Sequence, residues 1–207
     1  VSDKAGIVAF ATGLQEILPD LRIISTGNTA KTLHESGVEV SVVEDITQFP
    51  EMLGGRVKTL HPAVHGGILA DLENPQHIAD LQTHGIAPID IVVVNLYPFQ
   101  QTVAKEGVTR QEAVENIDIG GVTLIRAAAK NADRVTVICD PNDYEPVLEE
   151  LRANNGVLSF ETRVRLAIKA FDLTSQYDGA IANYLDTPEG EQFSRHLRFF
   201  SGEYVGF

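Results

Sequence analysis

The segment at residues 89–94, with the sequence IDIVVV, constrains the fold more than any other part of the chain. Its last four residues are β-branched, and such continuous runs are typical of strands buried on both faces of a parallel sheet. The run is far shorter than the roughly 20 apolar residues that a transmembrane helix needs. It therefore predicts a central buried strand, with Asn95 and Tyr97 at its carboxyl end.

Strand-like and helix-like segments alternate along the rest of the chain. Further strands are predicted at residues 21–25, 38–43 and 134–138. Helices are predicted at residues 7–18, 29–36, 75–84, 109–115, 122–130, 143–154 and 161–184, and an irregular stretch at 49–67. This order predicts an α/β fold, a mostly parallel sheet with helices on both faces and a carboxyl-terminal helical extension. In such folds ligands bind beyond the carboxyl ends of the strands.

The first helix begins very close to Val1. Because helices in α/β units follow strands, we expect Val1 to end a strand that begins upstream.

The charge balance excludes some classes of partner. The 207 residues include 16 Lys and Arg against 29 Asp and Glu, which gives a net charge of −13. General binding of nucleic acid or an anionic membrane needs a basic surface, so both are disfavoured, whereas a small phosphorylated ligand is not. The single cysteine, Cys139, excludes an intrachain disulfide and fits a reducing compartment. Because no signal pattern is present either, we expect a cytoplasmic protein.

The turn at residues 25–30 is a candidate phosphate site. A strand there runs into Thr26-Gly27-Asn28-Thr29 and a helix, and the free amides of a helix start favour an anion. The alternative is an ordinary helix cap at Thr26 or Asn28. The turn has neither a P-loop nor a GxGxxG pattern, which disfavours triphosphates and dinucleotides. Ser2-Asp3-Lys4 offers a similar choice between anion contact and helix capping; these seven residues are Ser2, Asp3, Lys4, Thr26, Gly27, Asn28 and Thr29.

The segment at residues 54–62, GGRVKTLHP, is a second candidate. Its two glycines allow close approach of a ligand to the backbone, and Arg56 and Lys58 point the same way if the segment is extended. A solvated basic loop is the alternative. His61 and His65 lack a matching cysteine or carboxylate cluster, so we expect no metal site.

Three further side chains have two interpretations each. Tyr97 is a site residue or a core aromatic, Asp118 is a site carboxylate or a cap before Gly120, and Lys130 is a proton carrier or a cation at a helix end.

Together these segments resemble one family. Residues 1–7, 25–30, 49–62, 95–99, 117–131 and 177–184 are similar, in order and spacing, to the amino-terminal IMP cyclohydrolase domain of the bifunctional AICAR formyltransferase/IMP cyclohydrolase family. The resemblance extends to about residue 185. It implies a methylglyoxal-synthase-like fold and the last step of purine ribotide synthesis, in which formylated AICAR ribotide closes to IMP and loses water. It implies no metal and no cofactor.

The resemblance also assigns roles to residues. It makes Lys130 the proton-transferring residue and places Lys58, Tyr97 and Asp118 around the closing ring. It implies nucleotide and phosphate contacts at residues 2–4 and 26–29 and at Arg56, Val57, Lys58 and Thr59. It implies contacts with the base at Val94, Asn95, Asp118 and Ile119. Asn28 departs from the pattern, because the family usually has glycine there.

Several alternatives remain open. The predicted domain covers residues 1–185, followed by a linker and tail at 186–207 without a formyltransferase domain, so the chain is a fragment of a bifunctional enzyme or a free-standing cyclohydrolase. A non-catalytic nucleotide-binding module of the same fold is a second interpretation. Methylglyoxal synthase is a third, but its aspartate motif has no match here. A homodimer is also considered, although in the family much of its contact comes from the formyltransferase domain.

Overall fold

The computed structural model describes residues 1–186, so the predicted tail lies outside the described residues except for Asp186. Its strands form two parallel pairs: β1 (Ile24–Ser25) with β2 (Ser41–Val42), and β3 (Ile91–Val93) with β4 (Thr136–Ile138). Both pairs are parallel, as the predicted α/β class requires. The division of the chain at residue 185 stays a prediction.

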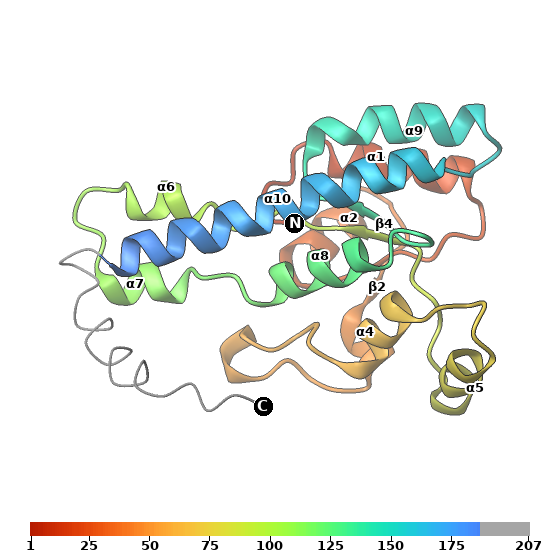
Figure 1. The fold of residues 1–207 in the computed structure, drawn as a ribbon, viewed down its shortest axis with the longest axis horizontal. Coiled ribbons are helices and arrows are strands. Elements are labelled where there is room, and N and C mark those ends of the chain that lie inside the picture. The colour runs from red at the N-terminus through yellow and green to blue at the C-terminus, as the bar shows by residue number, and fades with distance from the viewer. Residues whose placement is uncertain (187–207) are drawn as a thin grey trace, which may run out of the picture.

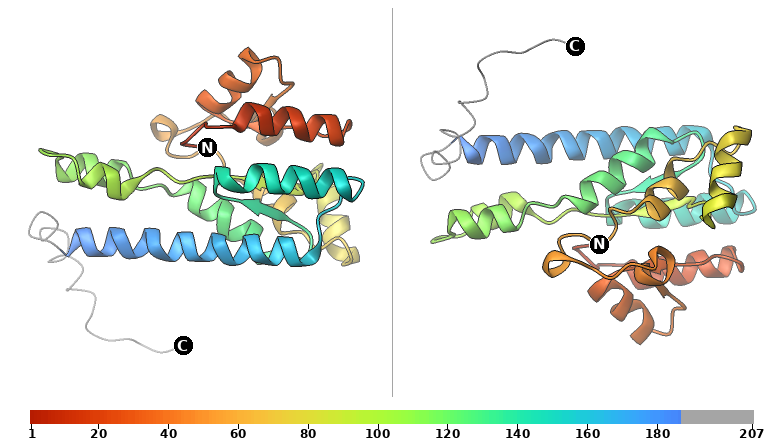
Figure 2. Two further views of the ribbon diagram at one scale, coloured as in Figure 1. Left: turned by 90° about the horizontal axis from the view of Figure 1, so that it is seen from above. Right: turned by 90° about the horizontal axis from the view of Figure 1, so that it is seen from below.

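Helices make up most of the described chain (Figure 1). They are α1 (Ile7–Ile17), α2 (Gly27–Glu35), α3 (Val43–Thr47), α4 (Pro62–Leu69), α5 (Pro75–His84), α6 (Phe99–Val103), α7 (Arg110–Glu115), α8 (Gly120–Lys130), α9 (Tyr144–Ala153) and α10 (Phe160–Leu185), with short 3-10 turns η1 (Leu53–Gly55) and η2 (Pro141–Asp143). Figure 2 shows α1 on one side of the β3–β4 pair and α10 on the other, so helices cover both faces.

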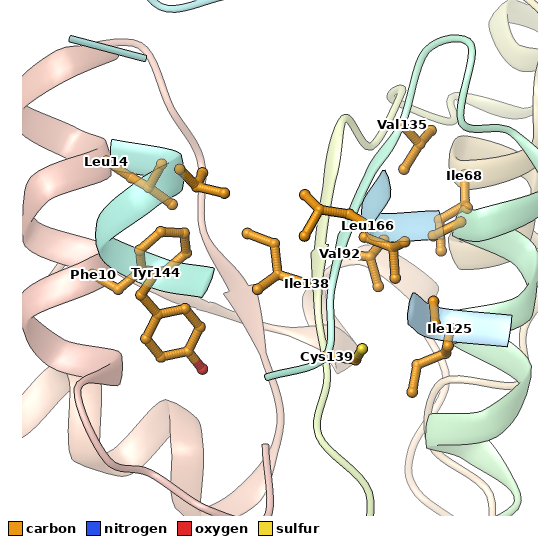
Figure 3. Packing of buried hydrophobic residues seen from close by; sticks show 14 of the residues in the cluster. Phe10, Leu14, Ile68, Val92, Ile125, Val135, Ile138, Cys139, Tyr144 and Leu166 are labelled. Carbon is orange, nitrogen blue, oxygen red and sulfur yellow. The ribbon is translucent and has the colours of Figure 1, made fainter. Parts of the chain in front are cut away.

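The main core forms around β4. Val135, Val137 and Ile138 are fully buried, and α10 packs against both β4 and α8. On the other side, the ring of Phe10 from α1 stacks on that of Tyr144 from α9, with centroids 4.5 Å apart. Figure 3 shows these two rings on one side of Ile138 and Ile125 on the other. Each large apolar side chain buried in this way contributes about 1.5–3 kcal/mol to stability.

A separate, smaller hydrophobic cluster joins α6, α7 and α10. Its buried members are Phe99, Ala113 and Tyr177, and we call it the second cluster. The ring of Phe99 meets those of Tyr177 and Tyr184 edge-on, at centroid distances of 6.2 and 5.7 Å. The second cluster therefore attaches the far half of α10 to the segments that follow β3 (Figure 1).

Local signals explain where several helices begin and end. The side chain of Asn74 accepts a hydrogen bond from the Gln76 amide at the start of α5, and Gly85 ends that helix with a φ of 63°. Thr109 and Glu112 form a reciprocal capping box at the start of α7. These are the elements whose bounds the sequence predicts best.

Three parts of the prediction are wrong. The strand predicted at 38–43 pairs only at Ser41–Val42, because Val43 begins α3, with Glu44 and Asp45 favourably placed in its first turn. The stretch at 49–67 is not irregular throughout: α4 begins at Pro62, where a missing amide costs nothing. Helix α6 was not predicted at all. Val1 belongs to neither strand pair.

An apolar cavity of about 500 Å³ lies between the two strand pairs. Phe10, Leu14, Ile24, Ile91 and Val93 are among the residues that line it. Its lining also includes four residues from the sequence-predicted site, namely Thr26, Thr29, Thr59 and Val94. The cavity thus connects the core with the carboxyl edge of the strands.

We expect Gly67→Ala to destabilise the fold and Gly66→Ala to be tolerated. A Cβ placed on Gly67 would lie 2.5 Å from the Ala87 carbonyl oxygen, whereas one on Gly66 would lie 3.4 Å from the nearest Ile86 carbon. Overpacking against backbone costs about 1–3 kcal/mol, while alanine in a helix gains up to about 1 kcal/mol over glycine. Urea unfolding followed by circular dichroism measures both free energies. Equal stabilities of the two variants would contradict the close packing of α4 on residue 87.

Candidate functional site

Asn95, two residues beyond β3, ties the amino terminus to the carboxyl edge of the strands. Its Oδ1 accepts hydrogen bonds from the amides of Ser2, at 2.5 Å, and Asp3, at 2.9 Å. Its Nδ2 donates to the Asp3 carbonyl at 2.8 Å. The Asp3 carboxylate in turn accepts from the Ala5 amide, which forms a tight turn before α1. The Asn95 side chain therefore fixes the backbone of residues 2 and 3 by hydrogen bonds, a role that the sequence did not reveal.

Val1 connects this segment to α2. Thr29 is buried, and its hydroxyl donates to the Val1 carbonyl at 3.2 Å. Lys4 Nζ donates to the carbonyls of Val1, at 3.5 Å, and Ser2, at 3.4 Å, so its ammonium group lies on this segment.

The start of α2 is open to an anion. Thr26 is the N-cap residue but its side chain makes no capping hydrogen bond, and Gly27 has a φ of 49°. A Cβ placed on Gly27 would lie 3.8 Å from Lys58 Nζ, which brings a cation to the positive end of the helix. Helix-start amides beside an ammonium group form a site suited to a phosphate.

Lys58 and Arg56 have separate partners. Lys58 Nζ lies 2.7 Å from Glu51 Oε2, while Arg56 pairs with Glu115 at the end of α7. The expectation that both cations point the same way rested on an extended backbone and is wrong, because Arg56 is helical, with φ −67° and ψ −24°. Only Lys58 lies beside Gly27. Neither acidic partner could be predicted, because Glu115 is 59 positions from Arg56 and no pattern singles out Glu51, seven positions before Lys58.

Asp118 stands at the start of α8. One carboxylate oxygen accepts from the Gly121 amide at 2.7 Å, so the residue does cap the helix. Thr59, which follows Lys58 in sequence, lies against the start of α8. A Cβ placed on Gly120 would be 3.2 Å from Thr59 Oγ1. Lys58 and Thr59 are consecutive, so they link the start of α2 to the start of α8. Capping and a site role are compatible for Asp118, as its second oxygen is not used in this bond.

The remaining predicted residues divide into exposed and structural ones. Tyr97 is 55% exposed and Ile119 is 56% exposed, so both side chains are available to a ligand. The core alternative for Tyr97 is therefore wrong; Phe99, two residues later, fills the second cluster instead. The Val94 amide donates to the Ile138 carbonyl, and Val57 pairs with Met52, so the backbone at these positions serves the fold.

Lys130 is not brought together with these residues. It is the last residue of α8, and Asp118 precedes the first. At a rise of 1.5 Å per residue, the Cα atoms of Gly120 and Lys130 lie about 15 Å apart. Within one chain the ammonium group of Lys130 is therefore remote from the start of α8.

The structure gives no metal-binding role to the two histidines of the candidate segment, His61 and His65. His61 Nδ1 accepts from the Ala63 amide and caps α4, and His65 Nε2 is buried without a hydrogen-bond partner. Among residues 1–186, no group of three or more His, Cys, Asp or Glu side chains could hold a metal ion. In the same residues, no helix has the length and apolar character needed to cross a membrane.

Comparison with protein-family models matches two parts of the chain. Residues 6–123 match the model of the MGS-like domain. Residues 128–203 match the model of the AICARFT/IMPCHase bienzyme.

Individual proteins give a consistent result. The chain is 57% identical over 185 residues to the bifunctional purine biosynthesis protein PurH of Polynucleobacter asymbioticus, covering 89% of this chain and 35% of that protein. It is 54% identical over 199 residues to PurH of Listeria welshimeri, covering 96% and 38%. Among solved structures it resembles that of ForH, with a TM-score of 0.76, 36% identity, and coverage of 87% of this chain and 93% of ForH. The chain thus spans little more than a third of the length of these two PurH proteins.

We expect Gly55→Ala to weaken phosphate binding and Gly54→Ala to preserve it. Both glycines have a positive φ, of 89° and 65°, so both variants carry a similar backbone cost of about 1–2 kcal/mol. Only a Cβ on Gly55 would collide with Lys58, at 2.8 Å from its Cε. Losing a charge-assisted hydrogen bond costs about 1.5–3 kcal/mol, which is roughly tenfold or more in affinity. A phosphorus NMR titration with phosphate measures the affinity of each variant. An equal loss of affinity in both variants would contradict the place of Lys58 in the anion site.

Proposed function

We propose that this chain, which belongs to the MGS-like domain family, is an IMP cyclohydrolase that closes formylated AICAR ribotide to IMP. The observation that carries the proposal is the link made by Lys58 and Thr59 between the starts of α2 and α8. One helix start is suited to a phosphate and the other carries Asp118, so a single ribotide would extend from one to the other. The family matches and the PurH relatives support the same reaction.

The reaction needs little beyond positioning and proton transfer. The carboxamide nitrogen forms a bond to the formyl carbon and loses one proton. The formyl oxygen takes up two protons and leaves as water, while the formamide nitrogen gives up its proton as the new C=N bond forms. Nucleophile and electrophile belong to one molecule, and holding them in reactive orientation is worth several kcal/mol.

The phosphate of the ribotide would bind at Thr26–Thr29. Amides of the first turn of α2 and the ammonium group of Lys58 would neutralise its charge. The segment at residues 2–4, held by Asn95 and Thr29, would form the neighbouring wall. Gly27 allows the backbone to approach the phosphate, and Asn28 keeps its amide donor although its side chain departs from the family pattern.

The base would lie toward the start of α8. Attack of the amide nitrogen places negative charge on the formyl oxygen, and amides at a helix start stabilise such a charge. Asp118 and the exposed Tyr97 are the candidates to draw the amide proton.

The role of Lys130 differs between the resemblance and the geometry. The resemblance makes it the proton-transferring residue, but α8 separates it from Asp118 by its whole length. We therefore propose that Asp118 and Tyr97 transfer the protons within the chain, while Lys58 stays with the phosphate. The same separation also favours a second candidate function, a nucleotide-binding module without catalysis.

We expect the purified protein to convert formylated AICAR ribotide to IMP. The absorbance of IMP measures the rate of this conversion. Lys58→Ala should lower kcat/KM about tenfold or more, the cost of losing one charge-assisted hydrogen bond to the phosphate. Lys130→Ala, the matched removal of a lysine outside the site, should lower it less than tenfold.

Each outcome has a distinct meaning. A loss of kcat/KM in Lys130→Ala as large as in Lys58→Ala would return Lys130 to the mechanism. An unchanged kcat/KM in Lys58→Ala would contradict its place at the phosphate. Tight binding of IMP without turnover would favour the nucleotide-binding module without catalysis. If the protein shows no binding of IMP and no turnover, the proposed function is wrong.

A further inference from the structure

Tyr177, on α10, holds the backbone just before α8. Its hydroxyl accepts a hydrogen bond from the Asp118 amide at 2.7 Å and lies 3.5 Å from the Asn116 carbonyl, to which it donates. One phenol group thus bridges two residues of the short connection between α7 and α8. The residue is 59 positions away from Asp118 in sequence, so only the fold brings them together.

The ring of Tyr177 contacts the other candidate catalytic loop. It meets Phe99 edge-on, and Phe99 follows Tyr97 by two residues. Phe99 is 2% exposed and Tyr177 is 8% exposed, so the contact lies inside the second cluster. The ring therefore supports the loop that carries Tyr97, while the hydroxyl supports the backbone of Asp118.

The hydroxyl is well suited to this role. Burial raises the pKa of Tyr177, and the nearby charges of Asp118 and Asp178 act in the same direction, whereas the hydrogen bond from the Asp118 amide opposes the shift. The phenol thus keeps the proton that it donates to Asn116. Removing the hydroxyl would leave the Asp118 amide without this acceptor and free the loop to shift.

We infer that Tyr177 is a positioning residue that sets the Asp118 and Tyr97 loops relative to each other. The inference rests on the proposed cyclohydrolase function. Tyr177 acts through its neighbours, because its hydroxyl is engaged with the backbone. The phosphate end of the site, at α2 and Lys58, has no contact with it in the interactions described above, so binding and turnover should respond differently.

The test compares Tyr177→Phe with Thr174→Val. Thr174 is one turn earlier on α10, is fully buried, and bonds only through its hydroxyl to the Phe171 carbonyl in its own helix. Both variants delete one buried hydroxyl from α10, but only Tyr177→Phe removes a contact with Asp118. In the full chain we expect Tyr177→Phe to lower kcat by 10-fold or more with KM changed less than threefold, and to quicken hydrogen exchange at the Asp118 amide.

Thr174→Val should lower the unfolding temperature comparably, yet leave kcat and the Asp118 exchange rate unchanged. Unchanged kcat in Tyr177→Phe, or an equal loss of kcat in Thr174→Val, would overturn the inference. If the parent chain gives no turnover, the proposed function fails. The exchange rate at Asp118 then decides on Tyr177 by itself, since an unchanged rate would overturn its positioning role.

Discussion

The pairing of β3 with β4 is the interaction on which the rest of the structure depends. These strands are parallel and lie under α8 and α10, with β4 fully buried. Because parallel strands end at the same edge, the residues that follow them gather there. Asn95 follows β3 and secures residues 2 and 3, and this segment in turn contacts α2. The site is therefore an extension of the sheet, assembled by segments that are far apart in sequence.

The start of α2 offers a local positive field in a chain with a net charge of −13. An acidic protein can bind an anion when its field is local, as at the first turn of α2 beside Lys58. Carboxylates are also close: Glu51 pairs with Lys58, and Glu115 with Arg56. These pairs orient the cations. A bound phosphate would have to compete with Glu51 for Lys58, which would make affinity sensitive to ionic strength.

The second cluster explains how a long helix takes part in the site. Helix α10 packs its first half on β4 and α8, and its second half reaches α6 through Phe99 and Tyr177. The α6 contact was not predictable, because α6 is five residues long and was missed. Short elements carry little periodicity and depend on their neighbours for stability. The same reason explains the error at 38–43, where a β-branched run is shared between a strand and α3.

The sequence alone determined the alternation of strands and helices, a strand within residues 89–94 that the structure has at Ile91–Val93, and the choice of most candidate site residues, since these depend on local pattern and recognisable motifs. Tertiary structure alone decided which of them meet. It placed Lys58 beside Gly27 and Thr59 beside Gly120, separated Lys130 from Asp118 along α8, and brought Tyr177 to the Asp118 amide. The physical reason is that side-chain proximity depends on how distant segments pack, and packing partners leave no mark on local periodicity.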